Sequence, residues 1–247
     1  MTRPLLVLGP SLGTSAATLW GACAELLAPD FETLVWDLPG HGGNRAPAAG
    51  PLTVADLARE VLSRVDGAFW YAGDSVGGAV GLQLALDAPD RVRGVVALCT
   101  GARIGTSESW LERADLVRTS GTPALVAASA QRWFGPGFVE REPARASALL
   151  HALSDADDDG YAAVCGALAE FDVRARLGEI GVPVLAVAGS DDVATPPDLL
   201  REIAEGVPHG CFVELPGVAH LAPIEAPERV AELVREHCTE TGRETFA

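Results

Sequence analysis

A serine flanked by glycines, at the point where a short apolar run ends, constrains the fold of this chain more than any other feature. Residues 68–72 (AFWYA) form the apolar run, residues 73–78 read GDSVGG, and helix-like apolar spacing follows. A strand, a sharp turn and a helix are the context of a nucleophile elbow. Gly73 and Gly77 stand two residues either side of Ser75, where a strained turn leaves no room for side chains. The pattern predicts a parallel sheet with Ser75 at its carboxyl edge.

Strand-like and helix-like segments alternate on both sides of this turn. Apolar runs ended by Gly, Pro or Asp predict strands at residues 4–8, 33–38, 68–72, 92–98, 182–188 and 211–215. Apolar helical spacing predicts helices at residues 14–27, 53–65, 76–86, 197–204 and 227–237, with Thr53 and Asp56 spaced as a capping box. This alternation predicts an α/β fold with a mostly parallel, doubly wound sheet.

The alternation is interrupted once. Residues 102–178 hold few β-branched runs and many Ala, Leu and Glu residues, with breaks at glycines. We interpret them as a helical cap inserted into one domain, whose core comprises residues 1–101 and 179–247. A chain of 247 residues is compatible with one large domain carrying an insertion.

A nucleophilic serine needs a base and an acid that orients the base, and in this arrangement they follow in the order serine, acid, histidine. Asp192 comes just after the strand at 182–188, and His220 follows the strand at 211–215. Both positions lie at the carboxyl edge, so we predict a triad of Ser75, Asp192 and His220. Asp191 is the alternative acid. His41 comes too early in this order and is interpreted as a residue that braces its loop.

An oxyanion hole requires two backbone N–H donors, one after the nucleophile and one from the loop after the first strand. The first is Val76. The loop reads GPSLGT at residues 9–14, and because Pro10 has no N–H, Ser11 is the predicted second donor, with Leu12 as the alternative.

Composition excludes several classes of function. A net charge of −16 repels nucleic acid and anionic lipid, and no apolar run is long enough to cross a bilayer, so we expect neither partner and a cytoplasmic protein. All eighteen basic residues are arginines, which excludes lysine chemistry. The five cysteines are widely spaced and never form CxxC, so the sequence suggests neither a disulfide framework nor a zinc knuckle. Residues 155–160 match half of a calcium loop but lack its final glutamate, since Gly166 stands there. We therefore expect no metal and no cofactor.

These motifs give the chain a resemblance to the α/β-hydrolases and, within them, to the 3-oxoadipate enol-lactonases. The general motifs lie at residues 37–42 (DLPGHG), 73–78, 189–192 and 219–220, and the more specific ones at 9–14, 101–105 (GARIG), 132–138 (RWFGPGF) and 219–225 (AHLAPIE). The chain starts at the strand that follows an N-terminal hairpin in such hydrolases, which predicts a shorter sheet. Asp74 also departs from the family, where the residue before the nucleophile is more often apolar.

The resemblance implies a serine hydrolase, free of cofactors, that opens a small lactone through an acyl-enzyme. Such a lactone carries a carboxylate that needs a counter-charge on an acidic protein. Arg132 and Trp133, with Arg103 at the entry to the cap, are the expected substrate-binding residues. The alternatives are hydrolysis of small esters or other lactones with perhydrolase side activity and, from a different class, an idle ligand-binding scaffold. The sequence makes no prediction of the oligomeric state.

Overall fold

The described residues, 3–46 and 50–244 of a computed structural model, form a six-stranded parallel sheet in the order β2-β1-β3-β4-β5-β6. The strands are β1 (Leu5–Gly9), β2 (Glu32–Val35), β3 (Phe69–Asp74), β4 (Val92–Leu98), β5 (Val184–Gly189) and β6 (Gly210–Leu215). Every residue of β3 and β5 is buried, because helices cover both faces of the sheet. The predicted α/β fold is confirmed.

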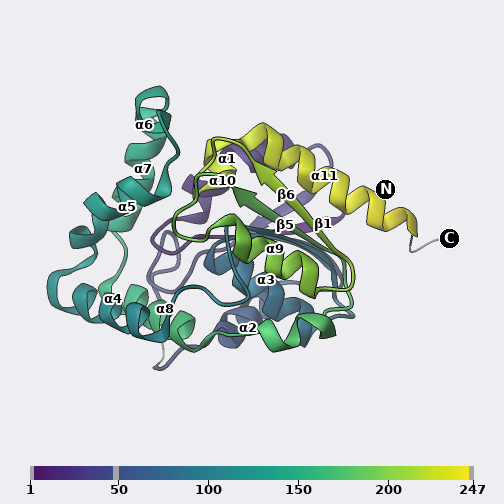
Figure 1. Cartoon of the computed structure of the whole chain (residues 1–247), viewed down its shortest axis with the longest axis horizontal. Coiled ribbons are helices and arrows are strands. Elements are labelled where there is room, and N and C mark those ends of the chain that lie inside the picture. Colours follow the sequence, from purple (N-terminus) through teal and green to yellow (C-terminus); the bar gives the residue numbers. More distant parts are fainter. Residues whose placement is uncertain (1–2, 47–49, 245–247) are drawn as a thin grey trace.

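The helices of the core lie in two layers, visible above and below the sheet in Figure 1. One layer contains α1 (Ala16–Leu27), α10 (Ala222–Glu225) and α11 (Pro227–Glu244), and the other contains α2 (Val54–Arg64), α3 (Val76–Asp87) and α9 (Pro197–Gly206). At the start of α2, Thr53 and Asp56 form the predicted capping box. Helix α11 runs past the predicted end at residue 237.

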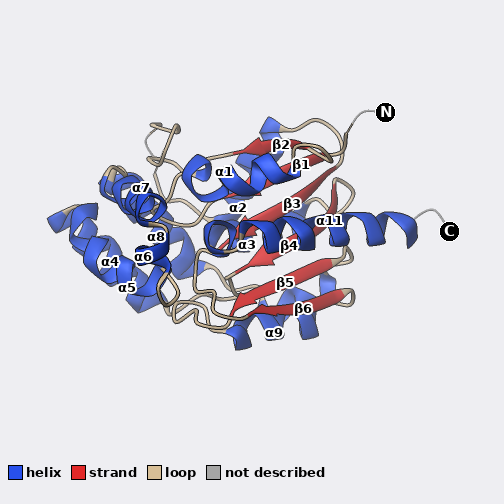
Figure 2. Cartoon of the chain, turned by 90° about the horizontal axis from the view of Figure 1, so that it is seen from above, coloured by secondary structure: helices blue, strands red, loops and turns tan. Residues whose placement is uncertain are grey.

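A separate group of helices projects from one end of the sheet, as Figure 2 shows. It contains α4 (Ser107–Ser120), η1 (Thr122–Leu125), α5 (Val126–Trp133), α6 (Phe138–Arg141), α7 (Pro143–Ser154) and α8 (Asp158–Glu170), and the chain returns to β5 through η2 (Arg174–Glu179). An inserted helical region is thus present between β4 and β5. We refer to residues 102–178 as the cap, keeping the predicted boundaries.

The cap is joined to the core partly through backbone atoms. The N–H of Asp157 donates to the carbonyl of Gly40 at 2.8 Å, and a Cβ on Gly160 would lie 2.6 Å from the carbonyl oxygen of Pro39. The ring of His41 stacks on Tyr161 of the cap, with 5.9 Å between ring centres. The loop after β2 therefore supports the first turn of α8 at close range.

Candidate active site

Ser75 occupies the sharp turn between β3 and α3. Its φ of 54° lies in the left-handed region that residues other than glycine rarely adopt. A Cβ on Gly73 would lie 2.3 Å from the backbone of Gly77, and a Cβ on Gly77 would lie 2.7 Å from the backbone of Gly9. The glycines are needed because β3, α3 and the loop after β1 meet here at backbone contact distance.

The turn brings Ser75 to the histidine and the acid that follow it in the chain. His220 Nε2 lies 3.0 Å from Ser75 Oγ, and His220 Nδ1 lies 2.8 Å from Asp192 Oδ2. Ser75, Asp192 and His220 are 7, 3 and 5% exposed, respectively, so this chain of hydrogen bonds is largely shielded from water. Such a chain can move a proton from the hydroxyl to the imidazole.

Asp192 is held by donors on both oxygens. Oδ1 accepts the N–H groups of Ala194 (2.7 Å) and Thr195 (3.0 Å), and Oδ2 accepts the Thr195 hydroxyl at 2.6 Å as well as His220. Burial alone raises the pKa of this carboxyl, but His220 and Thr195 outweigh burial and the pKa is lowered. Asp191, the alternative acid, is exposed and contacts Ser190 instead of a histidine.

The loop after β1 lies beside Ser75. Gly77, the second residue of α3, donates its N–H to the carbonyl of Pro10 at 3.0 Å. Ser11 is buried, and Ser11 and Leu12 line the same cavity as Ser75. Val76 is the first residue of α3, where N–H groups lack a partner within the helix. The predicted oxyanion donors therefore lie on the two backbone segments next to the serine.

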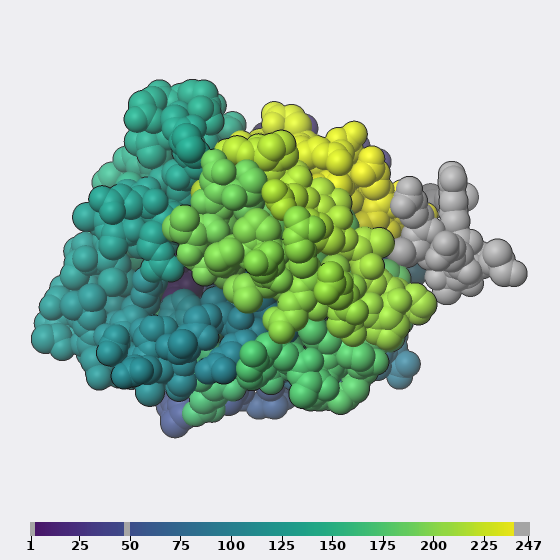
Figure 3. Space-filling view, viewed as in Figure 1, coloured from purple at the N-terminus to yellow at the C-terminus, as the bar shows by residue number. Residues whose placement is uncertain are grey.

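A cavity of about 190 Å³ opens beside Ser75 and His220, between the cap and the core. Figure 3 shows the hollow at this boundary. Its size is below the roughly 300 to 1,000 Å³ of pockets for drug-sized ligands, so it suits a small substrate. The cap contributes Ile104, Trp110, Arg113, Ser129, Arg132 and Trp133 to its wall.

Two of the three predicted substrate-binding residues line this cavity. Arg132 and Trp133 do so, whereas Arg103 is absent from the wall and pairs with Asp172 at 3.9 Å. A second arginine, Arg113, lines the cavity instead. Our sequence analysis missed it, although Arg113 follows an aromatic residue by three positions, a spacing that puts both on one helical face.

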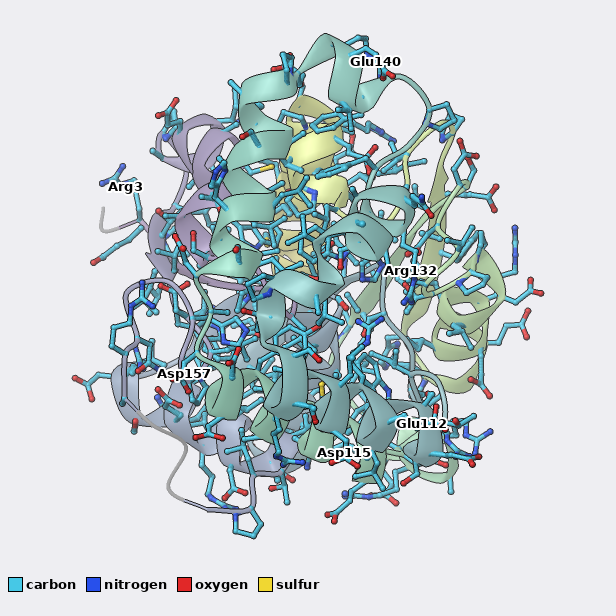
Figure 4. All side chains as sticks on the ribbon, turned by 90° about the vertical axis from the view of Figure 1, so that its left-hand side faces the viewer. Arg3, Glu112, Asp115, Arg132, Glu140 and Asp157 are labelled. Atoms are coloured by element: carbon cyan, nitrogen blue, oxygen red, sulfur yellow. The ribbon has the colours of Figure 1, made fainter. Side chains whose placement is uncertain are left out.

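The two guanidinium groups carry their charge into the cavity. Arg113 donates to the Tyr161 hydroxyl at 3.3 Å and lies 5.5 Å from the centre of the Trp110 ring. Burial, and then the charge of Arg113, lowers the pKa of Arg132. Among the described residues, neither arginine forms an ion pair with a carboxylate. Figure 4 shows Arg132 near the middle of the cap face, away from the labelled acids.

Asp74, which directly precedes Ser75 in the chain, is not among the residues that line the cavity. Its side chain is fully buried, and within the described residues neither oxygen has a hydrogen-bond partner. Burial, followed by the charges of Asp192 and Glu225, raises its pKa well above the usual range. This position favours the neutral carboxylic acid.

The acidic turn at residues 155–160 begins a helix. Asp157 is the N-cap of α8, and its side chain accepts the N–H of Gly160 at 2.8 Å. In residues 3–46 and 50–244, no group of three or more His, Cys, Asp or Glu side chains is placed to hold a metal ion. None of the helices in these ranges is long and apolar enough to cross a membrane.

Comparison with known proteins decides the family. Residues 6–233 match the model of the alpha/beta hydrolase family. The chain belongs to the alpha/beta hydrolase family. In this alpha/beta hydrolase the G-x-S-x-G turn at Ser75 follows β3, and Asp192 and His220 follow β5 and β6, which is the chain order of that fold.

Two of its relatives are enol-lactonases. The alpha/beta hydrolase described here is 34% identical to the 3-oxoadipate enol-lactonase 2 of Acinetobacter baylyi, over 92% of this chain and 85% of that protein. It is 33% identical to the enol-lactonase from Burkholderia xenovorans LB400, whose crystal structure aligns with a TM-score of 0.92 over 97% of this chain and 92% of the other. A thermophilic esterase from Thermogutta terrifontis is 26% identical, with a TM-score of 0.88 over 97 and 91% of the two chains.

Proposed function

We propose that this chain is a serine hydrolase that opens 3-oxoadipate enol-lactone to 3-oxoadipate. Ser75 Oγ attacks the lactone carbonyl while His220 Nε2 takes the hydroxyl proton. Asp192 holds the imidazole in the required tautomer and stabilises the imidazolium that forms. The N–H groups of Val76 and Ser11, or Leu12 in place of Ser11, stabilise the negative oxygen of the tetrahedral intermediate.

The intermediate then collapses. The bond between the carbonyl carbon and the ring oxygen breaks, and His220 returns its proton to that oxygen, which leaves as an enol on the same molecule. The enol converts to a ketone, and this conversion makes ring opening hard to reverse. Water, deprotonated by His220, then attacks the ester on Ser75. The bond between the carbonyl carbon and Ser75 Oγ breaks, His220 returns its proton to Oγ, and the second carboxylate is released.

The observation that carries the choice of an anionic lactone is the pair of arginines in the cavity wall. Arg113 and Arg132 face the cavity without a carboxylate partner in the described residues, on a protein of net charge −16. Two like charges held together lack a counter-ion, and a substrate carboxylate would supply one. Trp133 provides an apolar wall for the ring. The similarity to two enol-lactonases supports the same substrate.

Hydrolysis of small neutral esters is the second candidate. The similarity to a thermophilic esterase favours it, and the serine, histidine and aspartate would act in the same way. An idle binding scaffold is the third reading, and a fluorophosphonate probe tests it directly. We expect the probe to label the wild type on Ser75 and to leave Ser75→Ala unlabelled, and Ser75→Ala to lose nearly all turnover. An unlabelled wild type would refute the hydrolase assignment.

The choice between an anionic lactone and a neutral ester depends on the arginines. Arg132→Met should raise KM for 3-oxoadipate enol-lactone about ten-fold or more, since a charge-assisted contact contributes roughly 1.5 to 3 kcal/mol. Hydrolysis of p-nitrophenyl acetate should stay nearly unchanged. The matched control is Arg145→Met, which removes the same charge from an arginine of the cap that pairs with Glu142 outside the cavity. Equal losses on both substrates would refute a role for Arg132 in binding the carboxylate.

A further inference from the structure

Glu225, the last residue of α10, connects two segments that are far apart in the chain. Its Oε2 accepts the N–H of Gly135 in the cap at 2.7 Å, and its Oε1 accepts the N–H of Ala219 at 3.0 Å. Ala219 directly precedes His220, the proposed base. One carboxylate therefore contacts both the cap and the loop that carries the base.

A second contact runs beside the first. The N–H of His220 donates to the carbonyl of Trp133 at 3.2 Å, and Trp133 lines the cavity. A Cβ on Gly135 would lie 2.7 Å from the carbonyl oxygen of Gly217 and 2.9 Å from Glu225 Oε2. The cap segment and the loop of His220 thus lie in backbone contact, and the carboxylate of Glu225 accepts a hydrogen bond from each of them.

We propose that Glu225 is a positioning residue, whose ionised carboxylate joins the cap to the loop of His220 and whose protonation loosens this joint. The inference rests on the proposed role of His220 as the base. An ionised carboxylate accepts both N–H groups, whereas in a carboxylic acid one oxygen carries a proton and is a weaker acceptor. Proton uptake therefore weakens one of the two contacts, and with it a restraint on both the cavity wall and the imidazole.

The surroundings of Glu225 place this change near neutral pH. Burial raises its pKa to about 7, against the opposing effect of the N–H groups and of His220. Titratable groups also lie on neighbouring elements. Burial, followed by the charges of Asp192 and Glu225, raises the pKa of Asp74 on β3. Cys23 on α1 donates its thiol to the carbonyl of Pro223 in α10. Burial raises the pKa of Cys23 to about 12, so that thiol remains neutral over the working range.

The experiment follows the amide signals of Gly135 and Ala219 by NMR from pH 5.5 to 8.5, beside kcat for p-nitrophenyl acetate. In the wild type we expect the Gly135 N–H to shift with a midpoint near 7 and kcat to rise over the same interval. Glu225→Gln should abolish the Gly135 titration and lower kcat about ten-fold. Glu228→Gln, an exposed neighbour on α11, removes the same charge and should change neither.

A wild-type Gly135 signal that does not titrate, or one that titrates equally in Glu225→Gln, would overturn the proposal. Gly135→Ala provides a second test if Glu225→Gln does not fold. Its Cβ displaces the Gly135 donor, so the midpoint at Ala219 should rise, and an unchanged or lower midpoint would count against the role of Glu225. The amide signals need no turnover. They therefore separate a failure of this inference from a failure of the proposed hydrolase activity, which the probe on Ser75 tests.

Discussion

Replacing Thr195 by valine tests whether the environment of Asp192 is built to keep that carboxyl ionised. The Thr195 hydroxyl donates to Asp192 Oδ2 at 2.6 Å, and the side chain is fully buried. Valine keeps the shape and removes the donor, while the backbone N–H groups of Ala194 and Thr195 remain on Oδ1. One of the contacts that lower the pKa of Asp192 is thereby lost.

The expected cost follows from the charge of the acceptor. A hydrogen bond to a charged group contributes about 1.5 to 3 kcal/mol to the free energy of unfolding. For a chain of this size each kcal/mol lowers Tm by roughly 2 to 4 °C, so we expect a fall of about 3 to 12 °C. We also expect kcat to fall about ten-fold, because the imidazole loses part of its orientation.

The pH dependence has a definite sign. Because the folded pKa of Asp192 is lowered, its contribution to stability is present above the unfolded value and is lost as the pH falls through the folded pKa. Thr195→Val raises the folded pKa towards the unfolded value, so the stability that Asp192 loses on acidification should be smaller, and the loss should end at a higher pH than in the wild type. Urea unfolding at several pH values from 3 to 7 measures this shift.

Thr122→Val is the matched control. Thr122 is equally buried, but its hydroxyl donates to the neutral carbonyl groups of Ser154 and Ala156 in the cap. Loss of a neutral bond should cost about 0.5 to 1.5 kcal/mol and leave kcat unchanged. If both variants lose the same stability, and Thr195→Val keeps full activity, the reasoning about Asp192 is wrong.

Three further changes test other parts of the site. Asp192→Asn should lower kcat by roughly 10² to 10⁴ because the amide favours the wrong imidazole tautomer, whereas Asp191→Asn should change kcat little. A larger loss of kcat in Asp191→Asn, measured by steady-state kinetics, would identify Asp191 as the acid instead. Because the pKa of Asp74 is raised in the folded state, the free energy of unfolding of the wild type should decline as the pH rises above about 4, and Asp74→Asn should flatten this decline. Identical urea midpoints at pH 5 and 8 in the wild type would contradict this. Gly77→Ala would place a Cβ 2.7 Å from the carbonyl oxygen of Pro10 and should lower activity about 10²-fold, so normal kinetics would exclude the close approach.

The elements that local patterns determine could be predicted from the sequence. Residues 92–98 form a strand with the predicted bounds, because an apolar run covered on both faces gives a clear signal. The strand predicted at residues 33–38 ends at Val35 instead. Asp37 accepts N–H groups of Ala16 and Gly43, so tertiary contacts hold this segment as a loop. The end of α11 was missed because its last residues are polar and carry no apolar period.

The candidate site divides in the same way. Ser75, Asp192 and His220 follow from strand ends, whose position at one edge of a parallel sheet is general. The contacts of Arg113 and Glu225 depend on where the cap settles on the core, and Gly135 meets Glu225 across 90 positions of the chain. A local sequence pattern cannot predict a contact between residues this far apart in the chain.

Some of the bonds between the cap and the core are ones that many different sequences can make. The amide of Asp157 reaches the carbonyl of Gly40, and the amide of His220 reaches the carbonyl of Trp133. A backbone group keeps its bond whatever side chain its residue carries, provided that the chain can follow the same path. Residues of the inner cap surface can therefore diversify during evolution while the attachment and the reactive centre are inherited unchanged. New substrate preferences would then arise by drift within one inserted segment.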